Sequence, residues 1–269
     1  MTDDPPRLLF FIPPDVLADG HGNALIVSVI VTAERKLVMA DYTQSAVRMS
    51  LLERPDVLED TLAPGLTSMW SLVQMSDGII AVTSWWVREI HLIKINGSKL
   101  ELVKKIKTTR YYAGVADFAD GTLIVSSLNY LGKDARIDII TRSGDVLQTI
   151  LSTEDTPDLG SLFCLTRSGR NLYVSDWTSN RVFRVDLETR EATAFFGDMD
   201  LSRLGLLEPR VVGFDDGGNM YLATGGGLYV TNTRTITSFA SFRSVQMDFG
   251  DNSKSTPVKI RGCMLTRCT

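Results

Sequence analysis

The chain has 269 residues, of which 44% are hydrophobic and 22% charged, and its formal net charge is −4. This mild acidity argues against a general nucleic-acid binder, which usually presents a basic face, and no apolar run approaches the ~20 residues of a transmembrane helix. Two histidines exclude a three-histidine zinc site, and three cysteines are too few for a disulfide scaffold. We therefore expect a reducing, cytoplasmic compartment and no metal or cofactor.

The first part of the chain differs in pattern from the rest of the sequence. We expect residues 1–23 to form an N-terminal segment, in which the apolar residues 7–12 supply a possible closing strand. The run is too short for a secretory signal, it follows two aspartates, and it ends at two prolines.

From residue 24 onward one sequence pattern recurs five times. Each copy has a turn, a short β-rich strand that ends in a small or acidic residue, a loop, and another strand. The recurring strands begin 42, 44, 49 and 48 residues apart, at Leu37, Ile79, Leu123, Leu172 and Met220. This period is typical of a four-stranded propeller blade of ~40–50 residues.

The other strands of each repeat can be placed around the recurring one. An apolar strand precedes it, as at 162–165, and a tight turn such as Asp77-Gly78 joins the two. A third strand alternates apolar and polar residues, as at Ile137 and Ile139. Because no segment has a convincing helical period, the sequence predicts an all-β propeller.

The number of repeats is not a whole number. The mean spacing of about 46 residues predicts roughly 5.4 blades between residue 24 and the end of the chain. Residues 258–265 are typical of the first strand of a sixth blade. We therefore predict a propeller of the six-bladed type with five recognisable blades in 24–257. The last blade would be incomplete or composite, closed by the C-terminal strand and tail at 258–269, unless part of a blade is missing from the sequence.

The repeats resemble a known family. Segment 171–197 is similar to an NHL repeat, with an apolar strand, Asp176, a polar loop and then Arg181-Val182 opening the next strand. Other similar segments are 36–51, 71–83, 104–127 and 136–150. Together they resemble the C-terminal propeller of invertebrate tripartite-motif-like (TRIM-NHL) proteins over roughly residues 24–232. No RING, B-box or coiled-coil pattern accompanies them, so ubiquitin-ligase activity is not implied.

The resemblance implies a torus with one functional face, formed by the loops between second and third strands and by the connections between blades. Aromatic residues concentrate there in the sequence, and Trp, Tyr and Arg are enriched at binding hot spots. The predicted partner-binding residues are Tyr42, Trp70, Trp85, Trp86, Arg110, Tyr111, Tyr112, Tyr130, Trp177, Asn180 and Arg210. For any one ring, the alternative is that it wedges between blades.

Two acidic residues end second strands, Asp41 and Asp176. We expect them to be structural, because a carboxylate at a strand end accepts hydrogen bonds from loop N–H groups. We find no catalytic cluster and therefore expect no enzyme activity.

The sequence thus favours a non-catalytic scaffold that binds a protein or peptide partner and does not contact a membrane. One alternative is a metal-dependent hydrolase or lactonase, which would need converging acidic or amide side chains in first strands, where Asp117 and Asp215 are the nearest candidates. Another is an RNA-binding propeller with a local patch of Arg88, Arg110 and Arg210.

Overall fold

A computed structural model describes residues 26–63, 65–84, 86–127, 135–154, 156, 159–196, 209, 211–214, 219–224, 227–232, 240–241 and 265–267. These residues form β-strands and turns and contain no helix, which confirms the predicted all-β class. The described part of the chain therefore offers no helix of the length and apolarity needed to cross a lipid bilayer.

The strands are grouped into sheets in chain order. The first sheet contains β1 (Ile26–Val31), β2 (Lys36–Asp41), β3 (Ala46–Leu51) and β4 (Arg54–Leu62). The second contains β5 (Met69–Gln74), β6 (Ile80–Ser84), β7 (Glu89–Asn96) and β8 (Lys99–Lys107). The third contains β9 (Tyr112–Asp117), β10 (Leu123–Ser127), β11 (Arg136–Ile140) and β12 (Val146–Ser152).

The next two sheets repeat this order. The fourth contains β13 (Leu162–Ser168), β14 (Asn171–Asp176), β15 (Arg181–Asp186) and β16 (Ala192–Phe196). The fifth, described mainly by its backbone, contains β17 (Val211–Phe214), β18 (Asn219–Thr224), β19 (Gly227–Asn232) and β20 (Ala240–Ser241). The predicted recurring strands are β2, β6, β10, β14 and β18, so the repeat is confirmed.

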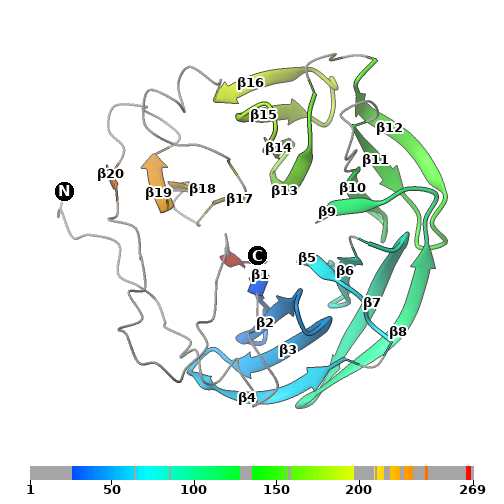
Figure 1. The fold of residues 1–269 in the computed structure, drawn as a ribbon, viewed down its shortest axis with the longest axis vertical. Coiled ribbons are helices and arrows are strands. Elements are labelled where there is room, and N and C mark those ends of the chain that lie inside the picture. The colour runs from blue at the N-terminus through cyan, green and yellow to red at the C-terminus, as the bar shows by residue number, and fades with distance from the viewer. Residues whose placement is uncertain are drawn as a thin grey trace.

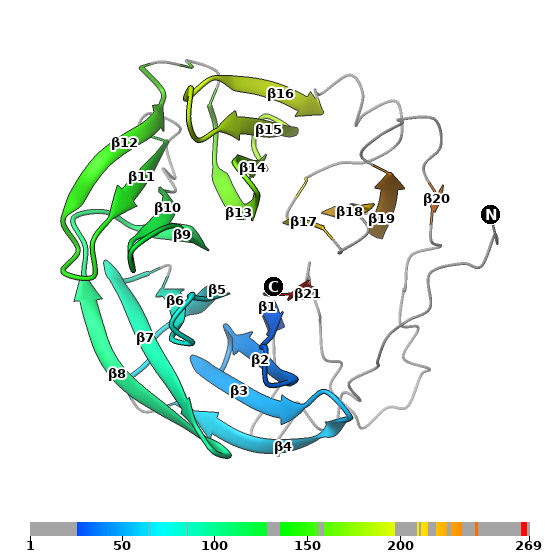
Figure 2. The ribbon, with the colours of Figure 1, turned by 180° about the vertical axis from the view of Figure 1, so that it is seen from behind.

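The sheets are arranged radially as propeller blades (Figure 1, and from behind in Figure 2). From β1 to β20, consecutive strands of each blade pair antiparallel. The first strand in chain order, β1, β5, β9, β13 or β17, lies nearest the centre among the four. Because the strands alternate in direction, turns between second and third strands share one face of the ring with the connections between blades. Turns between first and second strands and between third and fourth strands belong to the opposite face.

Apolar side chains hold neighbouring blades together. In β6, Val82 packs toward the first blade, whereas its neighbour Ala81 packs toward the third. This alternation follows from the two-residue period of a strand, which sends successive side chains to opposite faces of the sheet. Between the third and fourth blades, Ile124 and Ile137 pack in one cluster with Val174.

Tight turns depend on glycine where the backbone has positive φ. Gly78 follows Asp77 with φ of +81°, as the predicted hairpin requires. At Gly144 φ is +95°, and a Cβ atom would lie 2.1 Å from the carbonyl oxygen of Lys107. Only glycine fits this turn, because both its φ and its contact with the neighbouring blade exclude a side chain.

The prediction of six blades is not matched by the described residues, which form five sheets. Four of these blades have described side chains over most of their strands. The C-terminal strand β21 (Leu265–Arg267) pairs parallel with β1 and joins the first sheet, near the centre of the ring in Figure 1. The possible closing strand at 7–12 and residues 258–264 of the predicted C-terminal strand lie outside the described residues.

Candidate functional site

One face of the ring carries the exposed aromatic side chains. Trp86 is 54% exposed, Tyr111 is 43% exposed and Trp177 is 39% exposed. They lie respectively in the β6–β7 turn, the β8–β9 connection and the β14–β15 turn. We call this side, defined by these three residues and the half-buried Tyr42 of the β2–β3 turn, the aromatic face.

Two blades join through aromatic side chains on this face. The indole N–H of Trp86 donates a hydrogen bond of 2.6 Å to the Tyr42 hydroxyl. The Tyr42 ring in turn meets Trp70 edge-on, with centroids 5.7 Å apart and an interplanar angle of 86°. Trp70 itself lies half-buried in β5 rather than in a loop. These contacts fix the Trp86 turn of the second blade against the first.

A cation and an aromatic ring meet on the neighbouring turns. The Arg88 guanidinium carbon lies 4.9 Å from the centroid of the Tyr111 ring. The backbone joins the same two segments, since the Thr108 N–H donates to the Arg88 carbonyl over 2.8 Å. The Thr108 hydroxyl also donates to the carbonyl of Arg110 over 2.8 Å. Sequence reasoning placed Arg88 only in a possible RNA patch, because residue spacing gave no sign of this stacking.

The turn that presents Trp177 is fixed by a buried carboxylate. Asp176 accepts N–H hydrogen bonds from Thr178 and Ser179 over 3.1 Å each, and from Gly160 over 2.6 Å. The turn ends at Asn180, whose φ of +53° is the left-handed conformation that Asn tolerates. The Trp177 ring is therefore attached to a rigid backbone.

The matching turn in the first blade is built in the same way. Asp41 accepts an N–H hydrogen bond from Gln44 over 3.1 Å, and the turn ends at Ser45 with φ of +50°. Beneath it, Arg48 Nε donates to Asp41 Oδ2 over 3.0 Å. Both side chains of this ion pair are buried, at 0% and 1% exposure. A charged pair thus lies under the aromatic face.

Tyr112 does not belong to the exposed surface, contrary to its predicted role. Its side chain is 2% exposed, because β9 directs it between blades. The hydroxyl donates to Asp138 Oδ2 over 2.8 Å, while Thr149 donates to Asp138 Oδ1 over 2.8 Å. Burial, reinforced by this carboxylate, raises the pKa of Tyr112 well above its usual range. Tyr112 therefore anchors the end of the β8–β9 connection, which carries Tyr111, in the layer between blades.

The remaining predicted residues are only partly placed. Arg110 is half-buried in the β8–β9 connection. Trp85, Tyr130 and Arg210 lie outside the described residues. The face assembled from described side chains therefore extends from Tyr42 through Trp86 to Tyr111, with Trp177 two blades further along the chain.

Among the described residues, the first-strand acids do not converge as a metal site requires. The described part of the chain brings together no group of three His, Cys, Asp or Glu side chains that could hold a metal ion. Asp117 ends β9 on the opposite face, where its Oδ2 accepts the Ser76 N–H over 3.2 Å. Burial raises the pKa of this carboxyl group. Asp215 lies outside the described residues.

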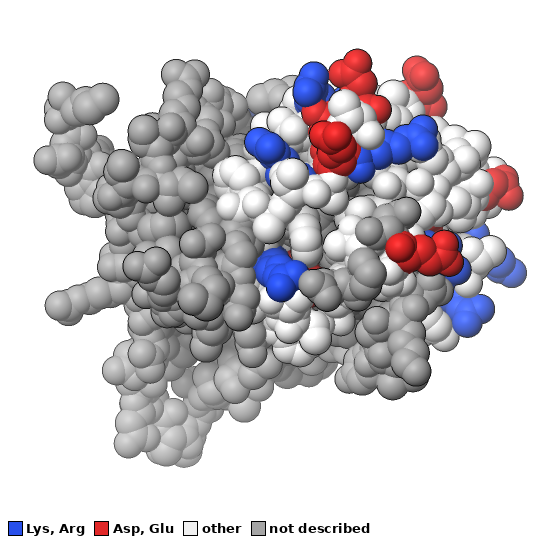
Figure 3. Space-filling model, turned by 90° about the horizontal axis from the view of Figure 1, so that it is seen from above, with Lys and Arg blue, Asp and Glu red and all other residues white. Residues whose placement is uncertain are grey.

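The opposite face is rich in ion pairs. Arg35 pairs with Glu53, and Arg142 Nη2 lies 2.5 Å from Asp77 Oδ2. In Figure 3, basic and acidic side chains lie interspersed on the described surface. Charged residues in the described turns of this face are Glu34, Arg35, Glu53, Asp77, Asp120, Arg142, Asp145, Arg170, Glu188, Arg190 and Glu191.

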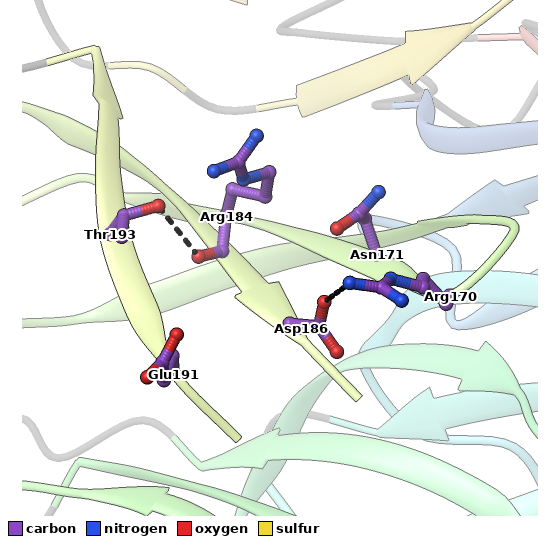
Figure 4. A pocket seen from close by; sticks show the side chains of 6 residues that line it. All are labelled: Arg170, Asn171, Arg184, Asp186, Glu191 and Thr193. Carbon is purple, nitrogen blue, oxygen red and sulfur yellow. Dashed lines mark hydrogen bonds and ion pairs between the residues drawn. The ribbon is translucent and has the colours of Figure 1, made fainter. Parts of the chain in front are cut away.

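A hollow of about 310 Å³ lies over β14, β15 and β16 of the fourth blade (Figure 4). Within it Arg170 pairs with Asp186 over 2.7 Å. Arg170 also pairs with Glu188, outside the lining, over 3.4 Å. The residues that line it are Arg170, Asn171, Arg184, Asp186, Glu191 and Thr193.

No protein-family model and no curated protein matches the sequence. Solved structures do share the fold. A protein of unknown function from Bacteroides caccae has a TM-score of 0.60 at 14% identity and covers 78% of each chain. A chain of the nidogen/laminin complex has a TM-score of 0.61 at 13% identity, covering 81% of this chain and 80% of its own.

A third similar structure is a catalytically inactive virginiamycin B lyase from Staphylococcus aureus with quinupristin. Its TM-score is 0.58 at 15% identity, covering 83% of this chain and 71% of its own. At such identities the likeness establishes the fold, a β-propeller, and does not extend to activity.

Proposed function

We propose that the protein is a non-catalytic interaction module that binds a protein or peptide partner through its aromatic face. The observation that supports this most strongly is the set of solvent-exposed rings Trp86, Tyr111 and Trp177. The second blade, its connection to the third blade and the fourth blade present them on one side of the ring. Scattered apolar residues on a surface are ordinary, but large rings collected on one face are typical of interaction surfaces.

The turns that carry these rings are already ordered before a partner binds. The turn of Trp86 is joined to Tyr42, and the turn of Trp177 is held by Asp176. A side chain that is already ordered loses less entropy when a partner covers it, so more of the burial energy appears as affinity. Aromatic side chains bury much area at a small entropic cost.

The NHL-like character of the repeats is part of the same proposal. The repeat spacing of 42 to 49 residues supports it.

The test is partner capture by the wild-type protein, followed by binding measurements with the purified partner. We expect Trp86→Ala and Trp177→Ala to weaken binding while both variants stay folded. The matched control is Leu147→Ala, because Leu147 is 59% exposed but lies on the outer strand β12. Equal effects at all three positions would contradict the proposal.

An RNA-binding propeller gives a different result in a salt titration. The RNA alternative would be favoured if the protein bound single-stranded RNA without any protein partner, and if the affinity for that RNA fell steeply with salt concentration. Metal-dependent turnover would favour the hydrolase alternative.

A further inference from the structure

The described turns of the aromatic face differ from those of the opposite face in how their charges are paired. They carry Arg88, Arg110 and Glu154 as their charged residues. On the opposite face, by contrast, Arg35, Arg142 and Arg170 each form an ion pair with an acid of the same face.

Arg88 is the exposed cation of this face that no described carboxylate neutralises. The nearest acid in sequence is Glu89, whose Oε2 lies 3.0 Å from His91 Nε2 and 3.7 Å from Lys105 Nζ. The Glu89 carboxylate is thus already held within its own blade. Arg88 instead contacts the Tyr111 ring by its guanidinium group.

This stacking leaves the guanidinium ready for an external anion. A guanidinium that lies over a ring is covered on one flat side, while its N–H donors still point outward in the guanidinium plane. Those donors match the two oxygens of a carboxylate, and such bonds are among the stronger ones in proteins. Because the Thr108–Arg88 backbone hydrogen bond joins the two turns, little reorganisation is needed.

An apolar contact lies close to this cation. Trp86 is two residues before Arg88 in the β6–β7 turn and exposes more than half of its side chain. Its N–H group is already satisfied by Tyr42, so a partner would meet mainly the apolar ring. A partner segment that covers both residues therefore needs a carboxylate next to a large apolar side chain.

We propose that Arg88, stacked on Tyr111 beside Trp86, receives the carboxylate of an acidic residue that adjoins a large apolar residue in an extended segment of a partner protein. This inference rests on the proposed function and adds the partner's chemistry to it. Charge complementarity selects the occupant, because Arg88 is an exposed cation that stacks on a ring and that no described carboxylate pairs.

The experiment is a selection from a library of random peptides against immobilised wild-type protein. We expect enrichment of sequences with Asp or Glu beside Phe, Trp or Leu. The same selection with Arg88→Gln should lose the acidic enrichment and keep the apolar one, and Trp86→Ala should do the reverse. The matched control is Arg170→Gln, which removes an exposed arginine of the opposite face and should change neither.

The most enriched peptide is then synthesised with its acidic residues intact or replaced by amides. Wild type should bind the acidic form about tenfold more tightly, as expected for a charge-assisted hydrogen bond. Arg88→Gln should bind both forms alike. Selections that enrich no acidic residue, or an undiminished preference in Arg88→Gln, overturn the inference.

Failure of the inference and failure of the proposed function can be told apart. If Trp86→Ala weakens peptide binding but Arg88→Gln leaves the acidic preference intact, only the partner chemistry is wrong. If no peptide depends on Trp86, Tyr111 or Trp177, both are wrong. A single-stranded oligouridine probe that binds more tightly than any peptide, and does so through Arg88, would assign the site to nucleic acid instead.

Discussion

The two faces of this propeller are built from the same strands but present different surfaces. The aromatic face exposes Trp86, Tyr111 and Trp177, and the acids that end its second strands, Asp41 and Asp176, are turned inward to hold turns. On the opposite face, Glu53, Asp77 and Glu188 pair with arginines at the surface. The difference shows that similar acidic residues serve as buried supports on one face and as solvated charges on the other.

This contrast has an energetic consequence. A buried ion pair contributes little net stability, but removing one partner leaves an uncompensated charge in a dry environment. An exposed pair is screened by water and salt, so its loss costs little. The supports of the aromatic face should therefore be sensitive to mutation, and the surface ion pairs of the opposite face should tolerate it.

The largest effect is expected for Asp41→Ala. The change leaves Arg48 buried without this carboxylate and removes the acceptor of the Gln44 N–H. We expect the free energy of unfolding to fall by about 3–5 kcal/mol, measured by urea denaturation. The matched change on the opposite face is Arg35→Ala, whose ion pair with Glu53 is exposed. If the two variants had equal midpoints, the contrast between the faces would be wrong.

A second support is tested by Tyr112→Phe. The change removes the hydroxyl that donates to the buried Asp138 carboxylate and leaves the ring packing intact. Hydrogen bonds to charged groups contribute about 1.5–3 kcal/mol, so we expect a loss of that size in the free energy of unfolding. Tyr111→Phe is the control, because Tyr111 is exposed on the same connection. A neutral Tyr112→Phe would imply that water or another donor replaces the hydroxyl.

Much of this fold could be predicted from sequence, because a blade repeats local signals. Apolar alternation and glycine turns such as Asp77-Gly78 depend on neighbours in the chain, and the second strands lie where the repeat placed them. The pairing of β21 with β1 could not be predicted, because it joins segments more than 230 residues apart and no local pattern encodes it.

The candidate site was less predictable than the fold, because it depends on contacts between residues that are far apart in the chain. The loop position of Tyr111 and Tyr112 suggested two exposed rings, yet one is buried because it begins a strand that packs between blades. The role of Arg88 depends on a ring more than twenty residues away in the chain. Residue type indicated which face is rich in rings, whereas contacts across blades decide which rings reach solvent.

The comparison of faces is sharpened by Trp177→Ala, which should affect binding and not folding. The turn is held by hydrogen bonds from backbone N–H groups to the Asp176 carboxylate and by the bond from the backbone N–H of Trp177 to the Ser161 carbonyl. None of these bonds needs the Trp177 ring. We expect a melting temperature within a few degrees of wild type. A hot-spot ring contributes about 2 kcal/mol, or roughly thirtyfold in affinity for the partner, measured by calorimetry.

The control for Trp177→Ala is a change in the same turn that keeps the ring. Thr178→Ala removes the hydroxyl that accepts the Ser161 N–H over 3.0 Å. It should lower stability slightly and leave the affinity nearly unchanged. Early melting of Trp177→Ala, or normal binding while it is folded, would show that the ring packs against its own blade and is no hot spot.

The smallest effect concerns His91, which tests how dry the layer beneath the aromatic face is. Its ring is buried in β7, and burial lowers the pKa of His91, partly opposed by its hydrogen bond with Glu89. The unfolded chain keeps a histidine pKa near 6.5 and therefore binds more protons than the folded protein just below that pH. Stability should be unaffected above this value and decrease as the pH falls from about 6.5 toward the folded pKa.

This pH dependence has a specific origin that substitution can isolate. His91→Gln should flatten the curve of unfolding free energy against pH between about 7 and 5, where the carboxylates with lowered pKa, including Glu89, remain ionised. His21→Gln changes the other histidine of the sequence and is the control for unfolded-state titration. If the slope persists in His91→Gln, another group causes it, and the His91 ring of the wild type keeps its ordinary pKa because water reaches it. The layer that supports Trp86 and Arg88 would then be hydrated, and the rigidity on which their binding role depends would have to come from the turns alone.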